Sequence, residues 1–137
     1  MNRSVALLVW SSTLLVPLFF GGVAEAVRGD APHLPHNGVL FWVTVVVSAA
    51  CIALSQVVPQ RVAAVPAGRE ATAFIRLVSG WALLEGAALL PLVAWIVTED
   101  RRLLGVCAVD LLALVLLFPS ERRWQRLLPG EPIPARR

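Results

Sequence analysis

Four long stretches of apolar residues divide this sequence, and they limit its possible folds more than any other feature. The stretches cover Ser4–Ala24, Gly38–Val58, Thr72–Thr98 and Leu103–Phe118. A helix of about 20 residues rises about 30 Å, which is the thickness of the hydrocarbon core of a bilayer. The first three stretches reach this length, and the fourth falls just below the usual minimum of about 17 residues. We therefore expect an all-α protein, an integral membrane four-helix bundle made of two transmembrane hairpins.

The composition favours a membrane protein over a soluble one. Apolar residues make up 58% of the chain and charged residues 15%, whereas soluble domains contain about 45–50% and about 25%. The net charge is +3 and the pI is near 10.1, which in a soluble protein would suggest nucleic-acid binding. In a membrane protein, arginine gathers at the cytoplasmic helix ends instead. We predict the lipid bilayer as a partner, and no nucleic acid.

The positions of the arginines predict the orientation of the chain. If the N-terminus is inside, the outer connections hold Arg28, Arg101 and Arg102. The inner segments then hold the remaining nine of the twelve basic residues: Arg3, Arg61, Arg69, Arg76, Arg122, Arg123, Arg126, Arg136 and Arg137. Because cytoplasmic loops carry the excess of positive charge, we expect a multi-pass protein of the bacterial inner membrane with both termini in the cytoplasm.

The first stretch has an alternative interpretation as a cleaved signal peptide. Arg3, the apolar run and the sequence Ala24-Glu25-Ala26 resemble a signal peptide with its cleavage site. The apolar run is longer than the usual core of about 7–15 residues in such peptides. We therefore favour an uncleaved first helix.

Prolines and short connections predict where the helices end. Pro59 is expected to end the second helix and Pro119 the fourth, because proline lacks a backbone donor and clashes with the preceding turn. Only the segment 99–102 joins the third and fourth helices, which predicts a tight antiparallel hairpin. Residues 1–128 are thus predicted to form a single transmembrane domain. Residues 129–137, rich in proline and arginine, are predicted to be a disordered cytoplasmic tail.

Glu85 is a carboxylate near the middle of the third stretch, where a membrane helix is driest. A charged side chain at that depth costs at least ~2.5 kcal/mol, so such residues usually face the interior of a bundle and often mark a function. Two interpretations remain open. Glu85 either forms a hydrogen bond that holds a neighbouring helix, or it binds a proton or an ion.

Small residues beside Glu85 predict close packing of helices. Ala82 and Gly86 form a small-xxx-small pair, which lets another helix backbone approach. Pro91 leaves the carbonyl of Ala87 without its usual donor and permits a kink. We assign Ala82, Gly86 and Pro91 to helix packing. We also expect homo- or hetero-oligomers through such small-residue faces.

Asp110 is a second acid, near the middle of the fourth stretch. Counted from the hairpin connection, its depth differs from that of Glu85 by roughly 8 Å at the helical rise. Direct contact between the two acids is therefore not expected, although a water between them would fit. Glu85 and Asp110 are the candidate ion- or proton-binding residues.

The other polar residues do not suggest a known catalytic or metal site. His33 and His36 have no further ligands at a suitable spacing, so we expect no metal site. Cys51 and Cys107 are expected to be small apolar fillers of their helices. The sequence has no glycine-rich phosphate loop and no catalytic triad. We therefore expect neither an enzyme nor a cofactor.

The run FIRLVSGWALLEGAALLPLVAWIV, from Phe74 to Val97, resembles the carboxylate-bearing helix of the rotor proteolipids, the c subunits of F-type and V-type ATPases. This resemblance implies that Glu85 exchanges a proton or a sodium ion within a ring of copies. The glycine-repeat helices of such rings are missing here, and Asp110 has no counterpart in them. The whole chain is also similar to uncharacterised small four-span bacterial membrane proteins that end in Phe-Pro and a basic tail, as at Phe118 and Pro119. That similarity implies no activity.

Three functions are compatible with these features. We favour a small polytopic membrane protein that is a structural or accessory subunit of a membrane complex, with its acids serving helix packing. The second is a proteolipid-like protein that exchanges protons or ions through Glu85. The third is a small multidrug exporter working as an antiparallel dimer. It is the weakest, since such exporters carry their acid in the first helix and show little charge bias.

Overall fold

A computed structural model describes residues 3–27, 38–63, 66 and 68–128, and within these residues the chain forms helices and no strand. The helices are α1 (Arg3–Val27), α2 (Gly38–Arg61), α3 (Arg69–Thr98), α4 (Arg102–Leu116) and α5 (Glu121–Leu127). The prediction of an all-α fold is confirmed. The segment with His33 and His36 and the tail predicted over residues 129–137 lie outside the described residues.

Three helices, α1, α2 and α3, are long and apolar enough to cross a membrane. The helix α4 alone is too short to meet this criterion of length and apolar character. It meets the criterion only together with α5, and the two helices are bent by 79°. By length and composition, the described part of the chain therefore has three candidate spans, or up to four if the bent pair is one span.

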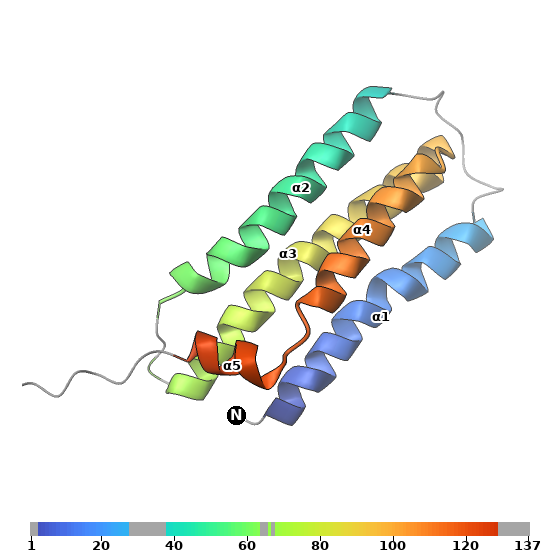
Figure 1. Cartoon of the computed structure of the whole chain (residues 1–137). Coiled ribbons are helices and arrows are strands. Elements are labelled where there is room, and N and C mark those ends of the chain that lie inside the picture. Colours follow the sequence, from blue (N-terminus) through green and yellow to red (C-terminus); the bar gives the residue numbers. More distant parts are fainter. Residues whose placement is uncertain (1–2, 28–37, 64–65, 67, 129–137) are drawn as a thin grey trace, which may run out of the picture.

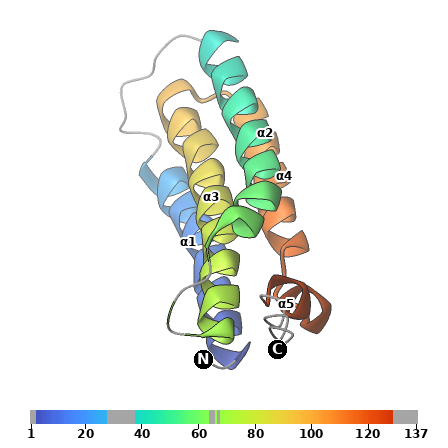
Figure 2. The ribbon, with the colours of Figure 1, turned by 90° about the vertical axis from the view of Figure 1, so that its left-hand side faces the viewer.

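The helix α3 is the centre of the arrangement. It packs against α1, α2 and α4, and α1 and α2 lie on either side of the pair formed by α3 and α4 (Figure 1). The start of α1, the end of α2, the start of α3 and the short helix α5 lie at one end of the molecule (Figures 1 and 2). The connection between α3 and α4 lies at the opposite end.

A tight turn joins α3 to α4, as predicted. Glu99 adopts the left-handed conformation with φ 53°, and its N–H donates to the carbonyl of Trp95 at 2.8 Å, which caps α3. The carboxylate of Asp100 then accepts hydrogen bonds from the backbone N–H and the guanidinium of Arg102. This turn directs α4 back along α3.

Two of the predicted helix ends are corrected by the structure. Pro59 does not end α2, which continues to Arg61 because the N–H of Val62 still donates to the carbonyl of Val58 at 3.2 Å. A proline in the last turn removes only one donor, so the turn around it persists. The helix α4 ends at Leu116, two residues earlier than predicted, and a tighter turn carries the chain to Phe118.

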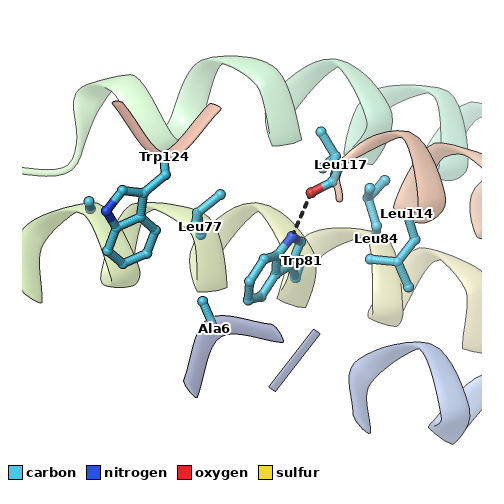
Figure 3. Close-up of a cluster of buried hydrophobic side chains, with 8 residues drawn as sticks. Ala6, Leu77, Trp81, Leu84, Leu114, Leu117 and Trp124 are labelled. Atoms are coloured by element: carbon cyan, nitrogen blue, oxygen red, sulfur yellow. Dashed lines mark hydrogen bonds between the residues drawn. The ribbon is translucent and has the colours of Figure 1, made fainter. Parts of the chain in front are cut away.

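The apolar side chains of this chain lie outside as well as inside. Leu8, Phe19 and Leu116 are 72%, 77% and 73% exposed, whereas the buried residues of α2 are Thr44, Ser48, Ser55 and Pro59. An apolar core exists around α3, where Trp81 and Leu84 pack with Leu114 of α4 and with Leu117, which directly follows α4 (Figure 3). The outer surface thus carries many large apolar side chains, and part of the interior is polar.

Candidate functional site

Polar side chains gather in two places. One is a buried carboxylate between α2 and α4, and the other is a cleft beside α5, which we call the basic cleft.

Asp110 is the most deeply buried acid of the described residues, with no exposed surface. It lies on the buried face of α4 with Leu103, Cys107 and Leu114, which follow one another at steps of three and four residues. The hydroxyl of Ser48 on α2 donates to its Oδ2 at 2.8 Å, and Ser48 is itself buried. The other oxygen, Oδ1, is buried and has no hydrogen-bond partner among the described residues.

Ser48 belongs to a narrow polar face of α2. The buried residues Thr44, Ser48, Ser55 and Pro59 lie on one side of the helix because their spacing follows its period. The hydroxyls of Thr44 and Ser55 donate to carbonyls of their own helix, Leu40 and Ile52. Of these three hydroxyls, that of Ser48 is the one that bonds to another helix.

Glu85 is less buried than Asp110 and lies at the edge of the packed face of α3. Within the described part of the chain it makes no hydrogen bond and no ion pair. The acids do not pair with each other, since the hydrogen-bond partner of Asp110 is Ser48. The sequence favours Glu85 over Asp110 as the candidate proton- or ion-binding residue. In the structure, Asp110 is the more deeply buried of the two acids.

The three predicted packing residues lie on different sides of α3. Pro91 is fully buried against the other helices. Ala82 and Gly86 are exposed, and a Cβ added at Gly86 would meet nothing within 4 Å. The close approach inside the chain occurs at Gly80, where an added Cβ would lie 3.2 Å from the carbonyl oxygen of Ser55. Among the described residues, Ala82 and Gly86 thus lie on an exposed face of α3, and their role in helix packing stays a prediction.

The basic cleft has a volume of about 670 Å³ and opens between α2, α3 and α5. Four basic side chains from α3 and α5 line it: Arg76, Arg122, Arg123 and Arg126. Among the described residues, no acidic side chain lines it. Amide and hydroxyl side chains complete its polar lining: Ser55, Gln56, Gln60 and Ser120.

The short helix α5 closes the cleft because the chain turns sharply after α4. Ser120 is the N-cap residue of α5, and its hydroxyl accepts from the N–H of Arg123 at 3.3 Å. Trp124 is 6% exposed and packs in the same cluster as Leu77 of α3 (Figure 3). The cap sets the start of α5, and the tryptophan holds α5 against α3.

Side chains from three helices satisfy the last carbonyls of α4. The indole N–H of Trp81 donates to Leu117 at 3.1 Å (Figure 3), and that of Trp10 donates to Leu114 at 3.2 Å. Arg123 of α5 reaches the carbonyl of Leu116 at 3.5 Å. Because the last carbonyls of a helix have no partner within it, these donors stabilise the bend between α4 and α5.

Arg76 joins the ends of three helices. Its Nε and Nη2 donate to the carbonyl of Val62 at 3.1 and 2.9 Å, and its Nη1 donates to the carbonyl of Leu127 at 2.9 Å. Val62 directly follows α2 and Leu127 ends α5, where helix carbonyls carry partial negative charge. Arg76 therefore stabilises the base of the cleft.

Arg123 is half-buried in the cleft wall. Its Nη2 donates to Oε1 of Gln56 on α2 at 3.4 Å, which is a long hydrogen bond. Burial and the neighbouring charge of Arg126 lower the pKa of Arg123 below its usual value. Within the described residues, Arg123 and Arg126 form no ion pair.

Comparison with protein-family models, with curated proteins and with solved structures gives no match. The resemblance of Phe74–Val97 to the rotor proteolipids stays a prediction from the sequence.

The apolar stretches and charges of the sequence did not predict the helix α5 or the basic cleft. The signal was present, since Ser120 followed by Glu121 is a typical helix start and Arg126 suits a last helical turn. In the sequence, the arginines after Pro119 indicate a basic flank that determines orientation. The apolar pattern of α5 is weak, because Trp124 and Leu127 are its apolar residues and the others are charged or polar.

Proposed function

We propose that this chain is a small integral membrane protein in which α1 to α4 cross the bilayer, acting as a structural or accessory subunit of a membrane complex. The distribution of polarity supports the membrane location. Large exposed apolar side chains cover the lengths of α1 and α2, while the hydroxyls of Thr44, Ser48 and Ser55 and the carboxylate of Asp110 lie inside. Hydrocarbon solvates such a surface well, and water does not.

The free face of α3 supports the role as a subunit. Three neighbouring helices cover α3 on its other sides, and the exposed residues Ile75, Ala82, Gly86 and Val93 form one stripe at helical spacing. Small residues in the middle of this stripe let a helix of another chain approach closely. Glu85, half-buried and without a hydrogen bond in the described chain, lies beside the stripe and would meet that helix. This stripe is the observation that carries the proposal.

Association through this face is tested by cross-linking and by mass. Copies with Ala82→Cys, in a chain whose Cys51 and Cys107 are replaced by alanine, should form a disulfide in membranes if the partner is a second copy. Gly86→Leu should abolish that product and lower the mass of the complex seen by native mass spectrometry. Gly105→Leu is the matched control, because Gly105 is also exposed and open space surrounds it on α4. A complex of unchanged mass in Gly86→Leu would contradict the proposal.

A second candidate function is proton or ion exchange at the buried acids, with Glu85 as the exchanging carboxylate and Asp110 as its alternative. One observation favours it, namely the buried Oδ1 of Asp110 that lacks a partner among the described residues. Glu85→Gln and Asp110→Asn keep size and hydrogen bonding but cannot exchange a proton. Under this candidate, one of them abolishes both proton flux into proteoliposomes and labelling by a carbodiimide. Unchanged flux in both variants rejects it.

A further inference from the structure

The basic cleft has no role in the proposed subunit function. Arg76 directs three N–H groups to the carbonyls of Val62 and Leu127, so its role there is structural. Arg122 and Arg126 are exposed and make no hydrogen bond or ion pair within the described residues. Arg123 makes only long hydrogen bonds, to Leu116 and Gln56. Three guanidinium groups of α5 are thus available to a ligand.

These three arginines crowd positive charge on two turns of one helix. Arg126 is four residues after Arg122 and three after Arg123, so the side chains are neighbours on the helix surface. Like charges at these spacings destabilise a helix, and no carboxylate among the described residues lines the cleft to compensate them. A bound anion would remove this repulsion.

Part of the cleft lining is apolar. Leu116 is 73% exposed and Phe118 is 40% exposed, and both line the cleft together with Leu117 and Trp81. If α4 crosses the bilayer as proposed, this apolar part borders the lipid chains, and the arginines lie at the level of the headgroups. A ligand that fits both parts carries an anion on an apolar body.

We propose that the basic cleft binds the phosphate group of an anionic phospholipid, with Arg122, Arg123 and Arg126 as the phosphate ligands and Leu116 and Phe118 beside the acyl chains. Guanidinium groups match phosphate oxygens in charge and in geometry. A volume of about 670 Å³ accommodates a headgroup and the first part of the chains. This inference rests on the membrane insertion in the proposed function, but not on its role as a subunit.

Arginines at a helix end also serve orientation, and the experiment separates this role from ligand binding. Orientation needs only positive charge at that end of the protein. A phosphate site needs the fork-shaped guanidinium and the place in the cleft. Arg61 provides a matched control, since it is exposed at the same end and does not line the cleft.

Native mass spectrometry of the purified full chain in detergent tests the proposal, with phosphatidylglycerol, phosphatidylcholine and inorganic phosphate as separate probes. The wild-type chain should retain phosphatidylglycerol over phosphatidylcholine. Arg122→Gln with Arg126→Gln should weaken phosphatidylglycerol binding at least about tenfold, since each basic residue near anionic lipid contributes measurably. Arg61→Gln, which removes one charge outside the cleft, should weaken binding less than Arg122→Gln alone or Arg126→Gln alone. Arg123→Lys, which keeps the charge but loses the fork, should weaken it as well.

Three results would overturn the proposal. Equal binding of the two lipids would show that charge is not recognised, and an equal loss in Arg61→Gln would show that surface charge alone attracts lipid. Displacement of bound phosphatidylglycerol by an equal concentration of inorganic phosphate would make free phosphate the ligand. Circular dichroism checks that each variant keeps its helices, and resistance to alkaline extraction from membranes reports insertion. A chain that inserts but does not select lipid contradicts this inference alone, whereas a chain that does not insert contradicts the proposed function.

Discussion

The hydroxyl of Ser48 and the carboxylate of Asp110 form a 2.8 Å hydrogen bond that joins the middle of α2 to the middle of α4. Both residues are buried, and the bond crosses between helices that are separated by 40 residues of sequence. Without Ser48, neither oxygen of this carboxylate would have a partner among the described residues.

Ser48→Ala should therefore lower the free energy of unfolding by about 1–3 kcal/mol, because it leaves a buried acceptor unsatisfied. Thermal unfolding in detergent measures the effect. The matched control is Thr44→Val on the same face of α2, because the hydroxyl of Thr44 bonds within its own helix. In a double-mutant cycle, Ser48→Ala should cost less in an Asp110→Leu background than in the wild-type chain. Additive effects would show that the bond does not contribute to stability.

Gly80 and Gly86 should respond in opposite ways to the same substitution. A Cβ at Gly80 would lie 3.2 Å from the backbone oxygen of Ser55, so Gly80→Ala should push α2 from α3 and destabilise the protein by about 1–3 kcal/mol. A Cβ at Gly86 meets nothing within 4 Å. Gly86→Ala should leave the isolated chain unchanged or stabilise it by up to about 1 kcal/mol through helix propensity. Thermal unfolding of the two variants compares them, and equal destabilisation would be inconsistent with the described packing of α2 on α3.

The bend after α4 should depend on the indole N–H of Trp81. Trp81→Phe keeps most of the ring but removes the donor to Leu117, which should cost about 1 kcal/mol and expose the segment 117–120 to protease. Trp10→Phe removes a similar bond, but its acceptor, the carbonyl of Leu114, also receives the N–H of Leu117 at 3.2 Å. Its effect should be smaller. Limited proteolysis followed by mass spectrometry locates the cleavage, and equal sensitivity of both variants would contradict the assignment.

The sequence predicted the lengths of the helices better than their rotation about their own axes. The lengths of the apolar stretches predicted the approximate bounds of α1 to α4, since runs of that length with few charges are helical when they lie in lipid. It could not predict that Gly80 faces α2 while Gly86 faces outward. When both faces of a helix are apolar, hydropathy does not distinguish lipid from protein.

The same limit explains the buried acids. The depths of Glu85 and Asp110 along their helices were enough to predict that the two acids do not contact each other. The structure shows that the hydrogen-bond partner of Asp110 is Ser48. The pairing could not be found from the sequence, because α2 carries several hydroxyl residues and only its rotation selects Ser48. Pro59 shows a different limit, since its effect depends on how few helical turns follow it.

The helix α1 packs on α3 and to a lesser extent on α4, and this arrangement constrains the order of assembly. During synthesis, α1 is complete at Val27, but its main partner begins only at Arg69. At rates of about 5–20 residues per second, the first helix waits several seconds before α3 has been made. Among the described helices, α1 thus waits longest for its main partner. A quality-control protease or an insertion chaperone would encounter α1 while its buried face, with Thr13 and Pro17, is still uncovered.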